Sequence, residues 1–527
     1  MEREPVKAPS EQEVDEWVAK VKKAREEAEK QGDLPHAGSG FWGFLMDYRI
    51  PRTIITTYLF ARVLVSYVWF ALITKTFTEK GKRREALEEV HARNARRIYD
   101  SFVLLKGVYI KIGQFLSTQM ALLPPIYLVE MTKMQDRVPR ASTRQIRRRI
   151  REEFGKEIED ICLSFDTEPL ACASIGQVHR CIFKDGRHGV MKIKYPGIDA
   201  KFHTDLNVIN LMLPIFVRII ELAWYKEVSG IDHGKTIGEF VKYIRMELDY
   251  RNEIENHVRM RELLAAMREK GEIIIPELYP EYCTNAVIGM EFINGHKMMD
   301  WYSDPNVPGT KKDTLYKLLL NSMLHTITRH GFFQADTHPG NFMVYDKDPH
   351  NAECKPALVM IDFGCAKQLP ENFRVGVVEI INGYLTKNPD QITNALWDLS
   401  YRTKLHTKES LREWAVYGMK VTDIVVKHFN DGSDLITHLK GNLRQMTEDF
   451  NAVDQNHRID YIPEQYVMLG RILATPPIPI DKHQPKADLV QLIMPHMAVL
   501  TMAANEDKKR LEAVVKASPS ESVQQGA

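Results

Sequence analysis

A group of oxygen-bearing side chains in the second half of the chain has the spacing of a phosphoryl-transfer site. Asp336 stands five positions before Asn341, and Asp362 follows Asn341 by 21 positions, at the end of the apolar run 357–361. Transfer of a phosphoryl group from ATP requires oxygen ligands for Mg²⁺ and a carboxylate near the attacking oxygen. The order and spacing supply these parts. They predict Asp336 as the base or orienting residue, and Asn341 and Asp362 as the metal ligands.

A site of this kind, at protein-kinase spacing, also needs a lysine for the α and β phosphates and a helical acid that holds the lysine. Lys192 ends a strand-like stretch after a predicted hairpin turn, and Glu253 follows 61 positions later in a strongly helical segment, 247–253. Lys194 would share the face of Lys192 if the strand continued, but the Tyr-Pro-Gly sequence at 195–197 predicts that the strand ends first. We therefore expect Lys192 to contact the phosphates and Glu253 to hold Lys192.

The elements that must position these residues are predicted from hydrophobic periodicity. Apolar residues at helical spacings predict helices within 85–123, 143–154, 203–222 and 237–264. Two strand-like runs around the Asp185-Gly186 turn predict a hairpin over 178–193, and another strand is expected over 286–292. The rest of the chain reads as mostly helical, apart from a short pair of strands that flanks the predicted metal ligands.

Composition excludes several classes of protein. The 71 basic and 70 acidic side chains nearly cancel, whereas a dedicated nucleic-acid binder carries a strong basic excess. The six cysteines show no CxxC pair and no zinc-ligand spacing, which predicts reduced thiols in an intracellular compartment. Acidic residues near the N-terminus argue against a secretory signal and against a transit peptide. A length of 527 residues predicts two to four structural units.

The most apolar stretch runs from Ile54 to Ile73 and is interrupted by Arg62. A membrane-spanning helix needs about 20 apolar residues with few or no charges, so this stretch is marginal. Basic residues on both sides of it would suit a helix that lies on an anionic membrane surface. The sequence leaves three placements open: a buried or domain-packing helix, an interfacial helix and a spanning helix.

Three further motifs give the chain a specific resemblance. Lys111-Ile112-Gly113-Gln114 matches a KxGQ motif, Glu247-Leu248-Asp249 matches an ExD motif, and residues 169–179 match an alanine-rich loop that replaces the usual glycine-rich loop. Together with the residues above, these motifs resemble the UbiB, or aarF-domain, family of atypical protein-kinase-like enzymes. The resemblance covers roughly residues 90–370 by motif and is credible from about 45 to 505.

The resemblance implies an α+β, two-lobed protein-kinase-like fold, with a small β-rich N-lobe, a helical C-lobe and a helical N-terminal extension. The expected segments are a polar flexible N-terminal segment (1–40), a helical extension with the apolar stretch and the KxGQ motif (41–140), the N-lobe (141–292), the C-lobe (293–505) and a polar tail (506–527).

The resemblance also implies ATP and Mg²⁺ as cofactors. The residues expected to contact the nucleotide are Ala171, Cys172, Ala173, Ser174, Lys192 and Met290. In the family, the KxGQ helix folds across the cleft and places its lysine near the ExD carboxylates. The residues that would form this regulatory cluster are Lys111, Gly113, Gln114, Glu247 and Asp249. The cluster would occupy the place where a protein substrate binds, which resembles an autoinhibitory gate.

Three positions depart from the family pattern. Gln334 stands where the family usually has a histidine, two positions before its catalytic-loop aspartate, Met191 alters the strand before Lys192, and Cys172 replaces an alanine of the loop. None of these changes removes a charged catalytic group. No Ala-Pro-Glu sequence follows Asp362, which argues against a conventional platform for protein substrates.

The function implied by the resemblance is ATP- and Mg²⁺-dependent phosphotransferase or ATPase activity that supports isoprenoid-quinone or lipid metabolism at a membrane. An isoprenoid-quinone precursor is a candidate ligand, a membrane surface is an expected partner, and no nucleic acid is expected. The alternative is a largely non-catalytic, nucleotide-gated lipid-binding scaffold. A conventional Ser/Thr kinase is disfavoured. The sequence predicts an intracellular, membrane-associated protein but identifies neither the phosphate acceptor nor the oligomeric state.

Overall fold

The computed structural model describes most of the chain. The described residues are 49–74, 82–105, 107–116, 125–133, 140–172, 175–223, 248–431 and 489–517, with scattered positions between 449 and 469. The chain divides into two compact units, one of residues 1–251 with 278–292 and one of residues 252–277 with 293–527. The predicted N-terminal segment 1–40 lies outside the described residues. The five segment boundaries expected from the sequence stay predictions.

An antiparallel sheet forms the β-rich part of the first unit. Its strand order is β1-β3-β4-β6, with β2 paired to β3. The strands are β1 (Cys162–Phe165), β2 (Ala171–Cys172), β3 (Gly176–Phe183), β4 (His188–Lys194) and β6 (Val287–Glu291). The predicted hairpin is confirmed as β3 and β4. Its turn places Gly186 at φ +86°, a conformation that glycine adopts at little steric cost.

Strand β4 extends further than predicted. It ends at Lys194 instead of Lys192, because Lys194 pairs with Gly176 of β3 and its backbone N–H donates to the carbonyl of Ala286 (2.9 Å). Both lysines are buried. Since successive side chains of a strand point to opposite faces, Lys192 and Lys194 lie on the same face of the sheet.

Helices α8 (Thr143–Phe154) and α9 (Ile158–Ile161) pack on the opposite face of the sheet. Ile146 and Ile150 of α8 lie in one buried cluster with Met191 of β4. The helix predicted over 143–154 is confirmed. Ser142 and Gln145 form a capping box at its start, which satisfies backbone N–H groups that a helix leaves without an internal acceptor.

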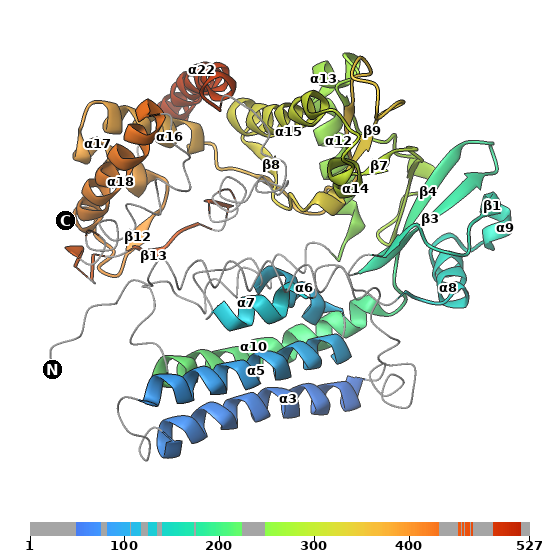
Figure 1. Ribbon diagram of the computed structural model, residues 1–527, viewed down its shortest axis with the longest axis horizontal. Coiled ribbons are helices and arrows are strands. Elements are labelled where there is room, and N and C mark those ends of the chain that lie inside the picture. Colours follow the sequence, from blue (N-terminus) through green and yellow to red (C-terminus); the bar gives the residue numbers. More distant parts are fainter. Residues whose placement is uncertain are drawn as a thin grey trace, which may run out of the picture. The chain divides into compact units, whose positions relative to one another are not determined.

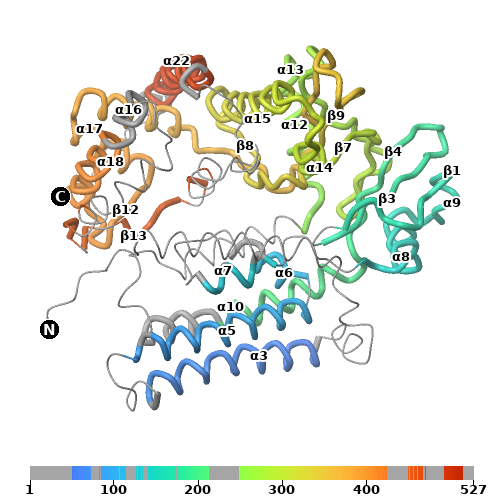
Figure 2. Tube along the Cα trace, viewed as in Figure 1, coloured from blue at the N-terminus to red at the C-terminus, as the bar shows by residue number. Residues whose placement is uncertain are grey.

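The rest of the first unit is helical. Its elements are α3 (Arg49–Trp69), the π-helical turn η1 (Phe70–Thr74), α5 (Arg83–Leu105), α6 (Val108–Leu116), α7 (Pro125–Thr132) and α10 (Ile198–Ala223). Figures 1 and 2 show α3, α5 and α10 running side by side. The helical stretch predicted over 85–123 is divided at Gly107, whose φ of +58° ends the regular path of α5 and separates it from α6.

Buried polar side chains join these helices. Arg52 of α3 is 3% exposed and forms two charged hydrogen bonds to Asp205 of α10, each 2.6 Å long. The hydroxyl of Tyr67 in α3 is hydrogen-bonded to His91 Nδ1 in α5 (2.8 Å) and to the hydroxyl of Tyr127 in α7. Burial lowers the pKa of His91 to about 4. Burial also raises the pKa of Asp205, an effect that the hydrogen bond from Arg52 opposes.

The second unit begins with helices around small sheets. Its first elements are α12 (Tyr250–Leu263, whose first two residues belong to the first unit), α13 (Ala265–Glu269), β5 (Ile273–Ile274), β7 (His296–Lys297), α14 (Met298–Ser303), α15 (Gly309–His330), β8 (Phe332–Gln334), the 3₁₀ turn η4 (Pro339–Asn341), β9 (Phe342–Tyr345), β10 (Ala357–Met360) and β11 (Ala366–Gln368). One sheet has the order β5-β10-β9-β7, and β8 pairs with β11. The predicted pair of strands beside the metal ligands is confirmed as β9 and β10.

The C-terminal part of the second unit is mainly helical. It contains α16 (Phe373–Leu385), α17 (Pro389–Asp398), α18 (Arg412–Asp431), α22 (Leu489–Ala517) and the strands β12 (Arg402–Thr403) and β13 (Ile459–Tyr461). Helix α22 runs to Ala517, so the segment predicted as a polar tail from 506 begins as helix. Asp507 of α22 accepts two hydrogen bonds of 2.7 Å from Arg374 of α16, which fixes this part of the helix.

Candidate active site

The predicted catalytic loop lies in the second unit and is held by hydrogen bonds to its backbone groups. Asp336 follows β8, and the turn η4 ends at Asn341. The side-chain nitrogen of Asn341 donates to the backbone carbonyl of Asp336 (3.0 Å), and the N–H of Ile361 donates to the carbonyl of Asn341 (3.2 Å). His338 caps the turn by accepting the N–H of Gly340 (3.1 Å). The loop therefore has a defined path that ends beside the Asp362 segment.

Asp362 is held by a tight turn and by a neighbouring strand. Its Oδ1 accepts the backbone N–H of Gly364 (3.0 Å). The side-chain amide of Gln334 donates to the backbone carbonyl of Asp362, and the N–H of Ala335 donates to the carbonyl of Cys365 (2.9 Å). Gln334 thus joins the two segments, which gives a physical role to a residue that departs from the family pattern.

Glu253 lies against the same turn. It is 6% exposed, and a Cβ at Gly364 would lie 3.5 Å from its Oε2 and 3.4 Å from Oδ1 of Asp362. One turn further along α12, Asn256 donates to the carbonyl of Phe363 (3.1 Å). The second unit therefore brings Glu253 and Asp362 to one turn, and Asp336 and Asn341 to a loop bonded to it.

Lys192 lies in the first unit. It is 6% exposed, and its Nζ lies 5.4 Å from the centre of the Tyr250 ring, within the range of a cation–π interaction. Glu253 belongs to the second unit, and its pairing with Lys192 stays a prediction. The helical segment predicted over 247–253 is wrong in part, because α12 begins only at Tyr250 and Asp249 precedes it.

The residues expected to contact the nucleotide are also in the first unit. Ala171 and Cys172 form the short strand β2 and are exposed, whereas Ala173 and Ser174 lie outside the described residues. Met290 is buried in β6, opposite Val190 of β4. Their contact with a nucleotide stays a prediction.

The predicted regulatory residues are described only in part. Lys111, Gly113 and Gln114 belong to α6, although the Gln114 side chain is outside the described part, and so is Glu247. Asp249 accepts hydrogen bonds from the guanidinium of Arg251 at 2.6 to 3.0 Å. These bonds hold the pKa of Asp249 below its usual range, so it is a carboxylate at neutral pH. The gate formed with Lys111 stays a prediction.

The donor set fits Mg²⁺. This ion prefers a few carboxylate or amide oxygens, with phosphate oxygens and water completing its coordination. The amide nitrogen of Asn341 is bonded to Asp336, so the amide oxygen points away from that bond, and Asp362 supplies a carboxylate. Among the residues that the structure describes, no three His, Cys, Asp or Glu side chains form a metal-binding group, and a site of one amide and one carboxylate does not need one.

Two residues near Lys192, Tyr250 and Gly176, are not predicted from the sequence, and Lys194 is disfavoured there. Lys194 lies on the same face as Lys192, Tyr250 contacts both lysines, and Gly176 gives the Tyr250 side chain room. The spacing of two between the lysines was a usable signal for Lys194. Tyr250 is brought in from a distant segment, which no local pattern predicts.

The chain is similar in sequence to known proteins. The model of the ABC1 atypical kinase-like domain matches residues 133–396, which are 264 of the 527 residues. AarF domain-containing protein kinase 1 of Xenopus laevis is 27% identical over 363 residues, covering 67% of this chain and 65% of the relative. Protein ACTIVITY OF BC1 COMPLEX KINASE 8, chloroplastic, of Arabidopsis thaliana is 28% identical over 391 residues, covering 74% and 49%.

A solved structure is also similar. The complex of Rv3197 with erythromycin from Mycobacterium tuberculosis has 23% sequence identity and a TM-score of 0.42, covering 80% of this chain and 95% of that one. The alignments with the two curated relatives span less than two thirds of those proteins' own lengths. The family model and these relatives give the expected α+β kinase-like fold class, and the chain belongs to the ABC1 atypical kinase-like family, the UbiB or aarF family expected from its motifs.

Proposed function

We propose that this chain is an ATP- and Mg²⁺-dependent phosphotransferase or ATPase that supports isoprenoid-quinone or lipid metabolism at an intracellular membrane surface. The observation that supports the catalytic part is the hydrogen bonding between segments 334–341 and 361–365, which carry Asp336, Asn341 and Asp362. Kinase-like activity agrees with membership of the family.

Each polar residue has a role in this proposal. Asn341 and Asp362 would hold Mg²⁺, which neutralises charge on the transferring phosphoryl group when it is bound. Asp336 accepts a hydrogen bond from the attacking hydroxyl or water and orients it. Lys192 binds the α and β phosphates, and Glu253 orients its ammonium group. The other residues assigned to the nucleotide are Ala171, Cys172, Ala173, Ser174 and Met290.

The regulatory part of the proposal is a charge gate. Lys111, on α6 with Gly113 and Gln114, would lie near the carboxylates of Glu247 and Asp249 and exclude a protein substrate. The ionised state of Asp249 supports such a cluster. We expect Lys111→Ala to raise basal turnover, and unchanged turnover would contradict the gate.

The membrane part of the proposal is supported by the outward face of α3. Residues Ile50–Leu72 are long and apolar enough to span a membrane by length and composition. One face of the helix is buried through Arg52, Val63 and Tyr67, whereas large apolar side chains repeat along the other face and are 60% to 74% exposed: Ile50, Ile54, Tyr58, Val65, Trp69 and Leu72. Arg62 is exposed as well, and no acidic residue occurs from 49 to 74. This combination suits an anionic lipid surface.

ATP turnover by the purified chain tests the catalytic proposal. We expect Mg²⁺-dependent turnover by the wild type and a loss of about 100-fold or more in Asp362→Asn, because a fixed charge beside the reacting phosphate is removed. Asp300→Asn, an exposed aspartate of α14, is the matched control. A wild type that binds nucleotide with negligible turnover, even with lipid present, would favour the scaffold alternative.

Flotation with vesicles tests the membrane proposal. We expect the wild type to bind phosphatidylcholine vesicles that contain phosphatidylglycerol, and Ile54→Ser with Leu72→Ser to weaken binding by more than about tenfold, since two large apolar side chains lose their burial. Leu385→Ser is the control, because Leu385 is 77% exposed in the second unit. Equal loss in the control, or no loss in the α3 variant, would contradict the proposal.

A further inference from the structure

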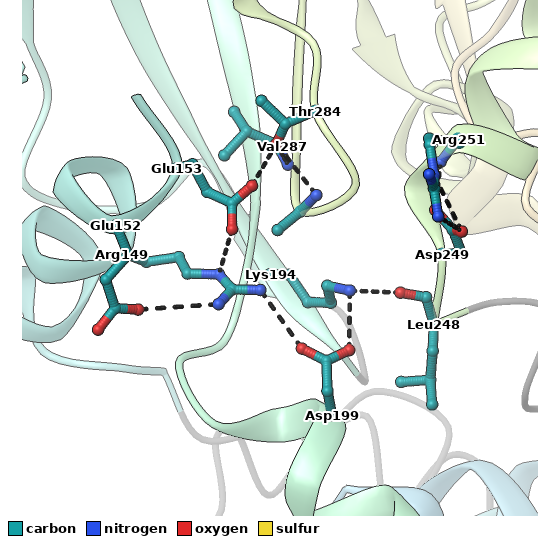
Figure 3. Close-up of polar contacts among 11 residues, drawn as sticks. Arg149, Glu152, Glu153, Lys194, Asp199, Leu248, Asp249, Arg251, Thr284 and Val287 are labelled. Atoms are coloured by element: carbon teal, nitrogen blue, oxygen red, sulfur yellow. Dashed lines mark hydrogen bonds and ion pairs between the residues drawn. The ribbon is translucent and has the colours of Figure 1, made fainter. Parts of the chain in front are cut away.

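A buried lysine outside the predicted site, Lys194, connects three segments of the first unit. Lys194, at the end of β4, is 2% exposed. Its Nζ donates to Asp199 Oδ1 of α10 (2.9 Å) and to the backbone carbonyl of Leu248 (Figure 3). An ammonium group taken out of water requires such partners, because desolvation disfavours the charged form. The position of Lys194 is therefore defined by charge as well as by packing.

Asp199 connects Lys194 to the helix on the other face of the sheet. Its second oxygen lies 3.3 Å from Arg149 of α8, which also lies 3.7 Å from Glu153 (Figure 3). Glu153 in turn accepts a hydrogen bond from Thr284 (2.8 Å), just before β6. One chain of polar contacts thus joins β4, α10, α8 and the loop before β6.

Leu248 is the middle residue of the Glu247-Leu248-Asp249 motif. Its carbonyl accepts a hydrogen bond from Lys194, and two residues later the N–H of Tyr250 donates to the carbonyl of Asn285 (3.2 Å). The backbone around Asp249 is therefore attached to the sheet on both sides. Without Lys194, one of these two attachments is lost.

The Tyr250 side chain lies near the ammonium groups of both Lys192 and Lys194. This side chain is fully buried, and its ring centre lies 5.4 Å from Lys192 Nζ and 5.7 Å from Lys194 Nζ. The Tyr250 side chain can lie this close to β3 and β4 only because residue 176 is glycine. A Cβ there would lie 2.6 Å from the Tyr250 hydroxyl and 2.5 Å from the carbonyl oxygen of Ile193. The ring of Tyr250, the first residue of α12, therefore lies against the strand that carries both lysines.

We propose that Lys194 is a positioning residue that fixes residues 248–250 on β4, so that the Tyr250 ring sets the place of the Lys192 ammonium and the backbone sets the place of the Asp249 carboxylate. Asp199 makes this placement depend on the position of α10. The inference rests on the proposed function in one respect, namely that Lys192 binds nucleotide.

The test compares Lys194→Met, which keeps an unbranched apolar stem, with Lys194→Arg, which restores a cation able to reach both partners. Lys184→Met, an exposed lysine next to the same hairpin turn, is the control. The full chain is titrated with a fluorescent ATP analogue, and amide hydrogen exchange is followed over 248–252 without nucleotide. Thermal unfolding is recorded for every variant.

We expect Lys194→Met to weaken nucleotide binding about tenfold and to speed exchange over 248–252, because the charged hydrogen bond that attaches Leu248 to β4 is lost. Lys194→Arg should recover most of both effects, and Lys184→Met should show neither. Nucleotide binding and local exchange equal to wild type, with only the unfolding temperature lowered, would overturn the proposal.

Two further measurements distinguish a failure of this proposal from a failure of the proposed function. If Lys194→Met does not fold, Asp199→Asn, whose side chain is 41% exposed, replaces it with a smaller expected effect of the same kind. A wild type that binds no nucleotide would contradict the proposed function, and the exchange measurement would still decide whether Lys194 fixes residues 248–250.

Discussion

Charged residues are held in different ways in two regions of this molecule. In the helical extension and sheet of the first unit, charged side chains hold one another, as Arg52 holds Asp205 and Asp199 holds both Lys194 and Arg149. In the 334–366 segment of the second unit, backbone groups and the amide side chains of Gln334 and Asn341 hold the segments that carry Asp336 and Asp362.

This difference predicts that substitutions in the first region mainly lower the free energy of unfolding, whereas substitutions in the second mainly lower turnover. Removing a side chain that pairs with another buried charge leaves that charge buried and uncompensated. Its loss is therefore expected to lower the free energy of unfolding. A carboxylate held by backbone N–H groups contributes little to that framework. Its loss is expected to appear mainly in turnover, as in Asp362→Asn.

The largest expected effect on stability is at Arg52. Arg52→Met leaves Asp205 buried and without its partner, which costs about 3–5 kcal/mol of the free energy of unfolding. The denaturation midpoint of the full chain measures it. The double variant Arg52→Met with Asp205→Leu should regain much of the loss, and Lys387→Ala, which removes an exposed pair with Asp423, should cost at most about 1 kcal/mol. Equal effects in the buried and exposed pairs would break the comparison.

The next effect is a pH dependence that originates at His91. Its pKa is about 4 in the folded chain, below the ordinary value of 6.5, so between these values the unfolded chain binds a proton that the folded chain does not. Stability should therefore fall as the pH is lowered from 6.5 to 4, by about 1.4 kcal/mol per pH unit. His91→Gln should have a shallower dependence over this window, measured by denaturation at a series of pH values. Parallel curves for both chains would contradict this assignment.

A smaller effect is expected at Gln334, whose side chain joins the two catalytic segments. Gln334→Leu removes the donor to the Asp362 carbonyl, which costs about 1–3 kcal/mol where a buried acceptor loses its partner. Gln334→His tests whether the residue usual in the family serves instead. Equal stability and turnover in wild type and Gln334→Leu would show that the backbone alone holds the segments.

Local patterns predicted much of the fold. The hairpin β3–β4, helix α8 and the β9–β10 pair were predicted from the spacing of apolar residues and from turn residues, signals that act over a few positions. The end of β4 was predicted two residues too early. Lys194 is paired with Gly176 and bonded to Ala286, and these contacts with distant segments cannot be predicted from the local sequence Tyr195-Pro196. The break at Gly107 was missed because the helical periodicity continues across it.

The candidate site was predictable to the extent that its residues are close in sequence. Asp336, Asn341 and Asp362 were found by spacing, and the structure adds the hydrogen bonds that join their segments. Tyr250 and Gly176 were not found, because their roles arise from contact between residues 74 positions apart. Such contacts depend on the path of the whole chain, which a motif does not contain.

Helix α10 is a continuous helix that is bonded to other elements at two points. Asp199 and Asp205 are six positions apart, about 9 Å along the helix axis at 1.5 Å per residue. The first is tied to β4 and the second to α3, and continuous helix lies between them with no flexible joint. A displacement of α3 would therefore be transmitted along α10 to the end of the strand that carries Lys192.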